Sequence, residues 1–180
     1  MPPISVPEGL PGIVGPLVAY PATAKHIRGL AQELLRGPSS LTPAEREIIG
    51  AHVSSGNECQ FCAKSHASAA RHLLGENAEL MDEVLANASS PRLDEKLRAL
   101  LTIAGKVRQD GRSVTAEDIA RARSAGADDR AIHDTVLIAA LFSMSNRYVD
   151  GLATFTPTDA AHYDEAGKAL ASVGYNSPAE

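Results

Sequence analysis

The sequence predicts an all-α protein with a single domain. Apolar residues recur at three- and four-residue intervals through most of the chain, and no stretch alternates apolar and polar residues for long enough to form a sheet. Glycines and prolines fall between the helical windows. A chain of 180 residues with 44% hydrophobic residues can bury a sizeable core. We therefore expect about seven to eight helices in residues 22–180, preceded by an arm formed by residues 1–21.

The N-terminal arm is predicted from its prolines, six of which lie in residues 1–21. Proline fixes φ and has no N–H, so we expect an extended segment that packs on the body of the protein or on a neighbouring subunit. The first helix is expected from about Ala22 to Arg36, and Gly37-Pro38 should end it. Its expected apolar stripe consists of Ile27, Leu30, Ala31 and Leu34.

A capping box marks the start of the second helix. Thr42 is the expected N-cap residue, and Pro43 takes the first helical position, where its missing N–H costs nothing. Glu45 lies three residues after Thr42 and can accept from the backbone N–H of the cap. This helix is expected to end at Gly56.

The rest of the chain is expected to form further helices separated by polar or glycine-containing turns. Met144 is expected on the buried face of the last long helix, and residues 175–180 are expected to fray. A weak echo between residues 68–85 and 119–136, both of which read as helix, glycine, helix, is an indication of a helical duplication. The expected helices are 59–74, 77–87, 93–108, 115–126, 128–150 and 159–173.

Composition and charge exclude several classes of function. A net charge of −5 and a pI near 5.7 argue against a nucleic-acid-binding surface. No apolar run of about eighteen residues occurs, so we expect no membrane span, and the proline-rich start lacks the basic region of a signal peptide. The only two cysteines lie too close together to be the framework of a secreted domain. We therefore expect a cytoplasmic protein.

The two cysteines form a C-x-x-C pair at the start of a predicted helix. With Asn57 as the expected N-cap residue, Cys59 and Cys62 share one helical face with His66. The helix N-terminus favours a thiolate, and the short spacing allows a small disulfide loop. His66, one turn after Cys62, can accept its proton. The preceding helix should return Glu47 towards the pair, where its carboxylate could orient His66.

Two other interpretations compete with a redox pair. The cysteines could be small buried hydrophobic residues, or they could bind zinc together with His66. A fourth zinc ligand would have to come from Glu47, His52, His72 or solvent. Structural zinc sites usually carry a second Cys or His pair further along the chain, and none follows here. We therefore expect neither a metal ion nor another cofactor.

The spacing of four residues resembles that of the alkyl hydroperoxidase D family, a member of the carboxymuconolactone decarboxylase-like superfamily of helical proteins. These residues are Glu47, Cys59, Cys62 and His66, and they follow the similar lead-in LTPAEREI. The later stretch NRYVDGLATFTP resembles the peroxidase-related branch of the same superfamily. The resemblance covers residues 41–157.

This resemblance implies a thiol-dependent peroxidase or disulfide-exchange enzyme on an alkyl hydroperoxidase D-like fold. Cys62 would be the peroxidatic nucleophile and Cys59 the resolving thiol. His66 and Glu47 would form the proton relay. The family's well-known members place a second His directly before the second cysteine, where this chain has Phe61. A weak peroxidase or a general disulfide reductase is therefore equally compatible with the sequence.

The resemblance also implies partners. These are a small peroxide or disulfide substrate, an unidentified thiol reductant and further copies of the chain, in a trimer or hexamer or else a dimer. Two alternative functions stay open at this point. One is a carboxymuconolactone decarboxylase-type lyase, which needs no cysteine pair, and the other is a metal-binding or structural oligomer.

Overall fold

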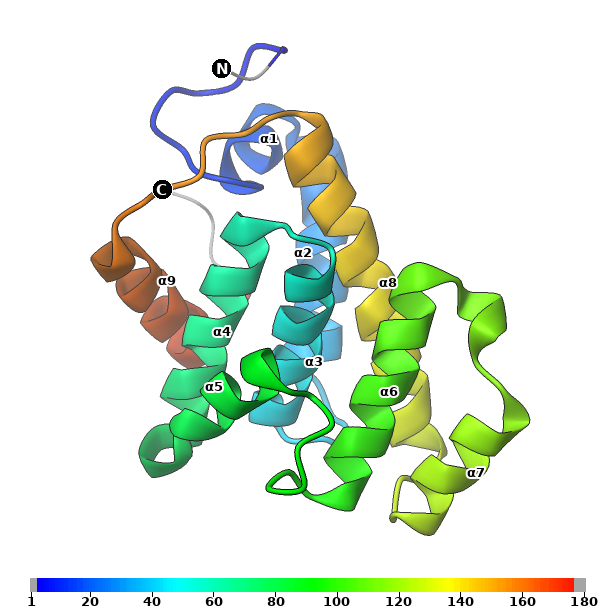
Figure 1. Ribbon diagram of the computed structural model, residues 1–180. Coiled ribbons are helices and arrows are strands. Elements are labelled where there is room, and N and C mark those ends of the chain that lie inside the picture. Colours follow the sequence, from blue (N-terminus) through cyan, green and yellow to red (C-terminus); the bar gives the residue numbers. More distant parts are fainter. Residues whose placement is uncertain (1–2, 177–180) are drawn as a thin grey trace.

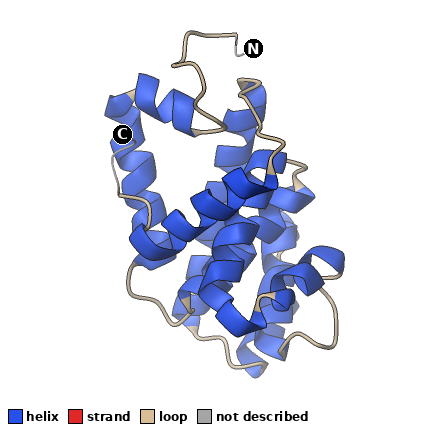
Figure 2. Ribbon diagram, turned by 90° about the vertical axis from the view of Figure 1, so that its left-hand side faces the viewer, coloured by secondary structure: helices blue, strands red, loops and turns tan. Residues whose placement is uncertain are grey.

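The computed structural model describes residues 3–176, and every regular element within this range is helical. Figure 2 shows only helices and loops there, so the predicted all-α class is confirmed. Two 3₁₀ turns, η1 (Gly75–Asn77) and η2 (Gly111–Ser113), accompany nine α-helices (Figure 1). The α-helices are α1 (Val14–Ala19), α2 (Pro21–Arg36), α3 (Pro43–Gly56), α4 (Gln60–Leu74), α5 (Glu79–Ala86), α6 (Glu95–Gln109), α7 (Ala116–Ser124), α8 (Asp129–Gly151) and α9 (Ala160–Val173).

The N-terminal arm was predicted to be extended. This prediction is wrong for part of the arm, because α1 forms within it. Pro16 is compatible with this helix since it lies in the first turn, where a backbone N–H has no intrahelical acceptor. The Gly12 N–H donates to the Phe155 carbonyl at 2.8 Å, which ties the arm to the segment after α8. The additional helix explains why the described residues contain more helices than expected.

Capping boxes define two helix starts, and the first is the one that the sequence predicts at Thr42. The Glu45 N–H donates to Thr42 Oγ1 at 3.2 Å, and the Thr42 N–H donates to Glu45 Oε2 at 2.7 Å. The same reciprocal pair forms between Thr115 and Asp118 at the start of α7. These local hydrogen bonds satisfy backbone N–H groups that the helix itself leaves without a partner.

Two expected core positions are wrong. Leu30 and Met144 are exposed, with 46% of Met144 accessible to solvent. The buried side chains of α8 recur every three or four residues on either side of Met144, so this residue falls on the opposite face. Residues 68–85 and 119–136 are both helix–turn–helix segments, in line with the weak internal echo. Within the described range, no helix is both long and apolar enough to cross a membrane.

The central helix is α3, which packs against α2, α4, α5, α6 and α8. Residues 46–51 are all buried, and Ile48 and Ile49 lie in the main hydrophobic core. Glu47 precedes them in the same helix and is also fully buried. α4 packs against α3 and α9, and Figure 1 shows α4 between these two helices. The α3–α4 pair therefore determines where the predicted site residues lie.

Gly50 allows α3 and α8 to approach closely. A Cβ at this position would lie 2.4 Å from the ring of Phe142. Overpacking of this kind typically costs about 1–3 kcal/mol. We expect Gly50→Ala to lower the free energy of unfolding by that amount, measured by urea denaturation.

Gly29→Ala is the matched control. Gly29 is an exposed residue of α2, and a Cβ there would meet nothing within 4 Å. Alanine should raise the free energy of unfolding by about 0.5–1 kcal/mol because of its higher helix propensity. Equal effects of the two substitutions would contradict a tight α3–α8 contact.

Candidate active site

The predicted hairpin of α3 and α4 is present, and its turn carries the first cysteine. Glu58 adopts a φ of 60° and reverses the chain, so that Cys59 becomes the N-cap residue of α4. The Cys59 N–H donates to the Ser54 carbonyl at 3.1 Å, which fixes the turn against α3. The first cysteine is thus held at the N-terminus of α4 by backbone geometry.

Asn57 does not cap α4, so that prediction is wrong. The turn at Glu58 separates it from the helix, and its Nδ2 donates to Asn146 Oδ1 at 2.9 Å instead. Asn146 Nδ2 in turn donates to Ser54 Oγ at 3.0 Å. Asn146 therefore links the hairpin turn and α3 to α8.

Glu47 and His66 lie together as the sequence predicts. Glu47 Oε2 is 2.8 Å from His66 Nδ1, and none of the Glu47 side chain is accessible to solvent. A carboxylate accepts but cannot donate, so the hydrogen bond places a proton on Nδ1. Nε2 of His66 is then the nitrogen that can accept a proton from another group.

Two residues of this cluster escaped the sequence reasoning. Arg36 Nη2, from the last turn of α2, donates to Glu47 Oε1 at 2.6 Å. Tyr175 donates its hydroxyl to the same oxygen at 2.5 Å. Arg36 reads in the sequence as an ordinary basic residue at a helix end, and Tyr175 lies in the tail that was expected to fray. No local pattern distinguishes either residue.

Arg36, His66 and Tyr175 hold Glu47 as a carboxylate. Burial alone would raise the pKa of Glu47, but the hydrogen bond from His66 and the charges of His66 and Arg36 oppose this effect. The hydrogen bond from Tyr175 acts in the same direction, and the net result is a lowered pKa. Glu47 is therefore available as a charged partner for an imidazolium at His66.

The two cysteines are free thiols with different surroundings. Cys59 is 0% and Cys62 is 3% exposed. A hydrogen bond from the Cys62 thiol lowers the pKa of Cys59 against the effect of burial, and the Cys62 backbone N–H adds to it. The same thiol hydrogen bond, followed by burial and the charge of Cys59, raises the pKa of Cys62. With its pKa raised, the Cys62 thiol needs a base to become a thiolate at neutral pH.

A small cavity of about 80 Å³ contains Cys62 and His66 in its wall. Cys62, His66 and Tyr175 meet there with mostly apolar side chains of α1, α2 and α8. A volume of this size holds only a few non-hydrogen atoms. Cys62 is therefore the cysteine that shares a cavity with the imidazole. The apolar part of the wall consists of Ile13, Leu17, Ile27, Ala31, Leu35, Phe61, Leu141 and Phe142.

Phe61, which stands where relatives of the family carry a second His, has a packing role. It is buried with Cys59, Cys62 and Tyr163, and Ile13 packs on the same cluster. A Cβ at Gly12 would lie 2.0 Å from the Phe61 ring, so the arm passes directly over it. An apolar ring at this position joins the arm to α4.

The residues considered as a fourth zinc ligand lie apart from the cysteines. His72 Nε2 is 2.9 Å from Asp164 Oδ1 on α9, and His52 lines a different cavity, beside Arg108. Among residues 3–176, no three His, Cys, Asp or Glu side chains gather in an arrangement that could hold a metal ion. Both carboxylate oxygens of Glu47 accept hydrogen bonds, Oε1 from Arg36 and Tyr175 and Oε2 from His66.

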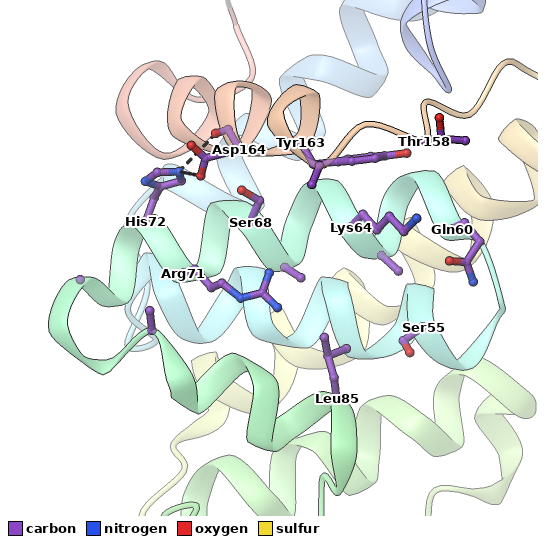
Figure 3. A pocket seen from close by; sticks show the side chains of 15 residues that line it. Ser55, Gln60, Lys64, Ser68, Arg71, His72, Leu85, Thr158, Tyr163 and Asp164 are labelled. Carbon is purple, nitrogen blue, oxygen red and sulfur yellow. Dashed lines mark hydrogen bonds and ion pairs between the residues drawn. The ribbon is translucent and has the colours of Figure 1, made fainter.

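A larger cavity, of about 730 Å³, lies on the other face of α4 (Figure 3). Its wall comes from α4, α5 and α9, with Lys64 close to the Tyr163 ring and His72 paired with Asp164. None of the four predicted site residues is part of this wall. Size alone therefore does not locate the site that the cysteines define.

Comparison with known proteins supports the resemblance. The model of the carboxymuconolactone decarboxylase family matches residues 21–106, which contain both cysteines. No curated protein matches the chain. A solved structure, an uncharacterized peroxidase-related protein from Silicibacter sp. TM1040, is 28% identical, with a TM-score of 0.74 over 83% of this chain and 78% of that chain.

Two further structures share the fold. An uncharacterized peroxidase-related protein with an alkylhydroperoxidase core, from Ralstonia eutropha JMP134, is 24% identical, with a TM-score of 0.77 over 88% of this chain and 82% of that chain. A protein of unknown function from Agrobacterium tumefaciens, described as a candidate antioxidant defence protein, is 20% identical. Its TM-score is 0.70 over 82% of this chain and 99% of that chain.

The fold is that of an alkyl hydroperoxidase D-like helical protein. The family match to residues 21–106 and the peroxidase-related structural neighbours support the carboxymuconolactone decarboxylase-like superfamily, as the sequence resemblance predicts.

Removal of the Phe61 ring should release the N-terminal arm. A buried Phe→Ala change typically costs about 3–5 kcal/mol, so we expect Phe61→Ala to lower the free energy of unfolding by that amount. Limited proteolysis should then cut residues 3–13 faster. Phe155→Ala is the control, because Phe155 is 56% exposed and holds Gly12 only through its backbone carbonyl. Equal proteolysis of both variants would contradict the packing role.

Proposed function

We propose that this protein is a thiol-dependent oxidoreductase that reduces peroxides or disulfides through Cys59 and Cys62. One observation carries the proposal: Cys62 and His66 face the same small cavity, while His66 is bound to the fully buried carboxylate of Glu47. Carboxylate, imidazole and thiol are the parts of an activated sulfur nucleophile. The neighbours named as peroxidase-related support the same class of reaction.

The first step is attack by Cys62. Nε2 of His66 accepts the Cys62 proton, and Glu47 stabilises the imidazolium that forms. The thiolate attacks the distal oxygen of a hydroperoxide, the O–O bond breaks, and the alkoxide leaves as an alcohol after taking the proton from His66. Sulfur is oxidised to sulfenic acid and the peroxide is reduced.

The second step joins the two cysteines. Cys59 gives up its proton and its sulfur attacks the Cys62 sulfenic acid; the S–O bond breaks, and the hydroxide leaves as water with that proton. The product is a Cys59–Cys62 disulfide. A dithiol reductant, the second expected partner, returns the pair to thiols by exchange and becomes oxidised itself. A disulfide substrate would enter by the same exchange.

The other candidate functions are weaker. A lyase of the carboxymuconolactone decarboxylase type is compatible with the family match, but it leaves the buried cysteine pair without a role. A purely structural oligomer leaves the Glu47–His66 pair without a role. We retain assembly into a trimer or hexamer, or else a dimer, as part of the proposal, to be tested by sedimentation.

Peroxide treatment should oxidise the two cysteines as a pair. We expect mass spectrometry to show loss of two thiols, one intramolecular Cys59–Cys62 link and no intermolecular link, since both residues lie within one helical turn. In Cys59→Ser, the oxidation should stop at a Cys62 sulfenic acid that dimedone traps. Two free thiols after oxidant at alkaline pH would refute the redox role.

His66→Ala should slow the reaction of Cys62 at pH 7 by about 10²–10⁴-fold, because a general base is lost. The rate should recover in part at high pH, where the thiolate forms without help. Glu47→Gln should give a smaller loss in the same direction. Alkylation rates across pH, measured in Cys59→Ser to isolate Cys62, test this expectation, with circular dichroism to verify folding.

Two outcomes would contradict the assigned roles. One is a His66→Ala variant that reacts like its parent at pH 7. The other is a faster reaction at Cys59 than at Cys62 in the unsubstituted chain, which peptide mapping of the alkylated protein would reveal.

A further inference from the structure

The segment after α9 folds back onto the core. Gly174 follows the helix with a φ of 81°, and its N–H donates to the Leu170 carbonyl at 3.1 Å. A Cβ at Gly174 would lie 2.5 Å from Gln32 Oε1, so both the backbone conformation and the space favour glycine. The next N–H, that of Tyr175, donates to Gln32 Oε1 at 2.7 Å. The turn directs Tyr175 towards α2 and the buried cluster.

Tyr175 contacts the three other members of the Glu47 cluster. Its hydroxyl donates to Glu47 Oε1 at 2.5 Å and lies 3.2 Å from His66 Nδ1. Its ring is stacked on the imidazole, with 11° between the planes and 6.0 Å between the centroids. The Arg36 guanidinium lies over the Tyr175 ring, 5.2 Å from its centroid. Tyr175 also lines the cavity that holds Cys62.

The two carboxylate oxygens of Glu47 have different hydrogen-bond partners. Oε1 accepts from Arg36 and Tyr175, which leaves Oε2 for the Nδ1–H of His66. With Oε1 held from two directions, the carboxylate cannot rotate away from the imidazole without losing a hydrogen bond to a charged group. The orientation of the base therefore depends on the donors at the far oxygen.

The charged and titratable groups around this carboxylate come from every neighbouring element. Arg36 belongs to α2, His66 to α4 and Tyr175 to the segment after α9, while Arg46 is the nearby cation of α3 itself. From α8 the group against His66 is the uncharged ring of Phe142, with 4.5 Å between centroids. The imidazole is thus held between an uncharged ring on one side and the tyrosine on the other.

We propose that Tyr175, delivered by the turn at Gly174, is a positioning residue for the His66–Glu47 pair, so that the C-terminal segment is part of the active site. The expected effect of Tyr175 on the reaction rate of Cys62 rests on the proposed function. The expected effect of Tyr175 on Glu47 is independent of that function.

The first test is Tyr175→Phe, which removes one hydroxyl and keeps the ring. Measured in the Cys59→Ser background, alkylation of Cys62 at pH 7 should be about tenfold slower, comparable to the loss of one hydrogen bond to a charged group. The difference from the Cys59→Ser parent should disappear at high pH, where the thiolate no longer needs His66. A merely structural role would lower the rate by a constant factor at all pH values.

A second variant, Gly174→Ala, leaves the whole cluster chemically intact. Alanine is disfavoured at a φ of 81° and would meet Gln32, so Tyr175 should be displaced. We expect the same pH-dependent loss as in Tyr175→Phe. Gly126→Ala is the matched control, because Gly126 has a φ of 94°, lies between α7 and α8, and has open space around its Cβ position. It should lower stability without changing the pH profile.

The second readout does not use the thiols. Burial would raise the pKa of Glu47, and the hydrogen bond from Tyr175 is one of the interactions that lower it. Loss of the hydroxyl should therefore move the titration of the Glu47 side-chain carboxyl to higher pH, observed by carbon-13 NMR and assigned with Glu47→Gln. Tyr163→Phe is the hydroxyl control, since that buried hydroxyl donates to the Pro157 carbonyl at 2.8 Å and should leave Glu47 unchanged.

The outcomes separate the two proposals. An unchanged Glu47 titration in folded Tyr175→Phe, or a Cys62 rate at pH 7 equal to that of the Cys59→Ser parent, would overturn the role of Tyr175. If instead His66→Ala has no effect on Cys62 while the Glu47 titration still moves in Tyr175→Phe, the proposed thiol chemistry fails and the control of Glu47 by Tyr175 stands.

Discussion

The buried carboxylate of Glu47 is the interaction on which the rest of the site depends. A carboxylate with no solvent access is costly unless charged and polar partners replace its water. Arg36, His66 and Tyr175 provide that replacement, and they come from three different segments. The Glu47 carboxylate of the central helix α3 is therefore hydrogen-bonded to α2, α4 and the C-terminal segment. Stability and the orientation of the imidazole have the same physical cause.

Close helix packing makes this arrangement sterically possible. The missing side chain of Gly50 leaves room for Phe142, whose ring meets the imidazole edge to face. Likewise, a Cβ at Gly167 would lie 2.2 Å from Ser68 Oγ, so α9 can approach α4 only because this position is glycine. The approach of α9 places the carbonyl of Leu170 within 2.9 Å of Arg36 Nη2. Small residues thus place the polar groups at hydrogen-bonding distance.

The two thiols differ because they occupy different levels of one helix. Cys59 is the N-cap residue, where the Cys62 thiol and its backbone N–H favour negative charge against the effect of burial. Cys62 lies one turn further on, facing the cavity that also contains His66. Cys62, whose pKa is raised, is therefore the thiol that lies beside the imidazole that can take its proton.

Much of the fold could be read from local patterns. Apolar periodicity, glycines and the Thr42 and Thr115 capping boxes predict the helices because those signals act within one or two turns. The Glu47–His66 contact was also predictable, since a short turn forces α3 and α4 to pack side by side. The prediction that Asn57 caps α4 was wrong. Glu58 adopts a left-handed backbone conformation, and Cys59 is therefore the N-cap residue.

The sequence by itself determined the all-α class, the α3–α4 hairpin and the residues of the thiol motif, because each follows from spacing along the chain. Only the tertiary structure decided that Arg36 and Tyr175 share the oxygen of Glu47, and that Cys62 rather than Cys59 faces a cavity. Those contacts join positions up to 128 residues apart and depend on how closely α2, α4 and α9 approach α3. Such distances are set by the packing of the whole core, and no local pattern in the chain encodes them.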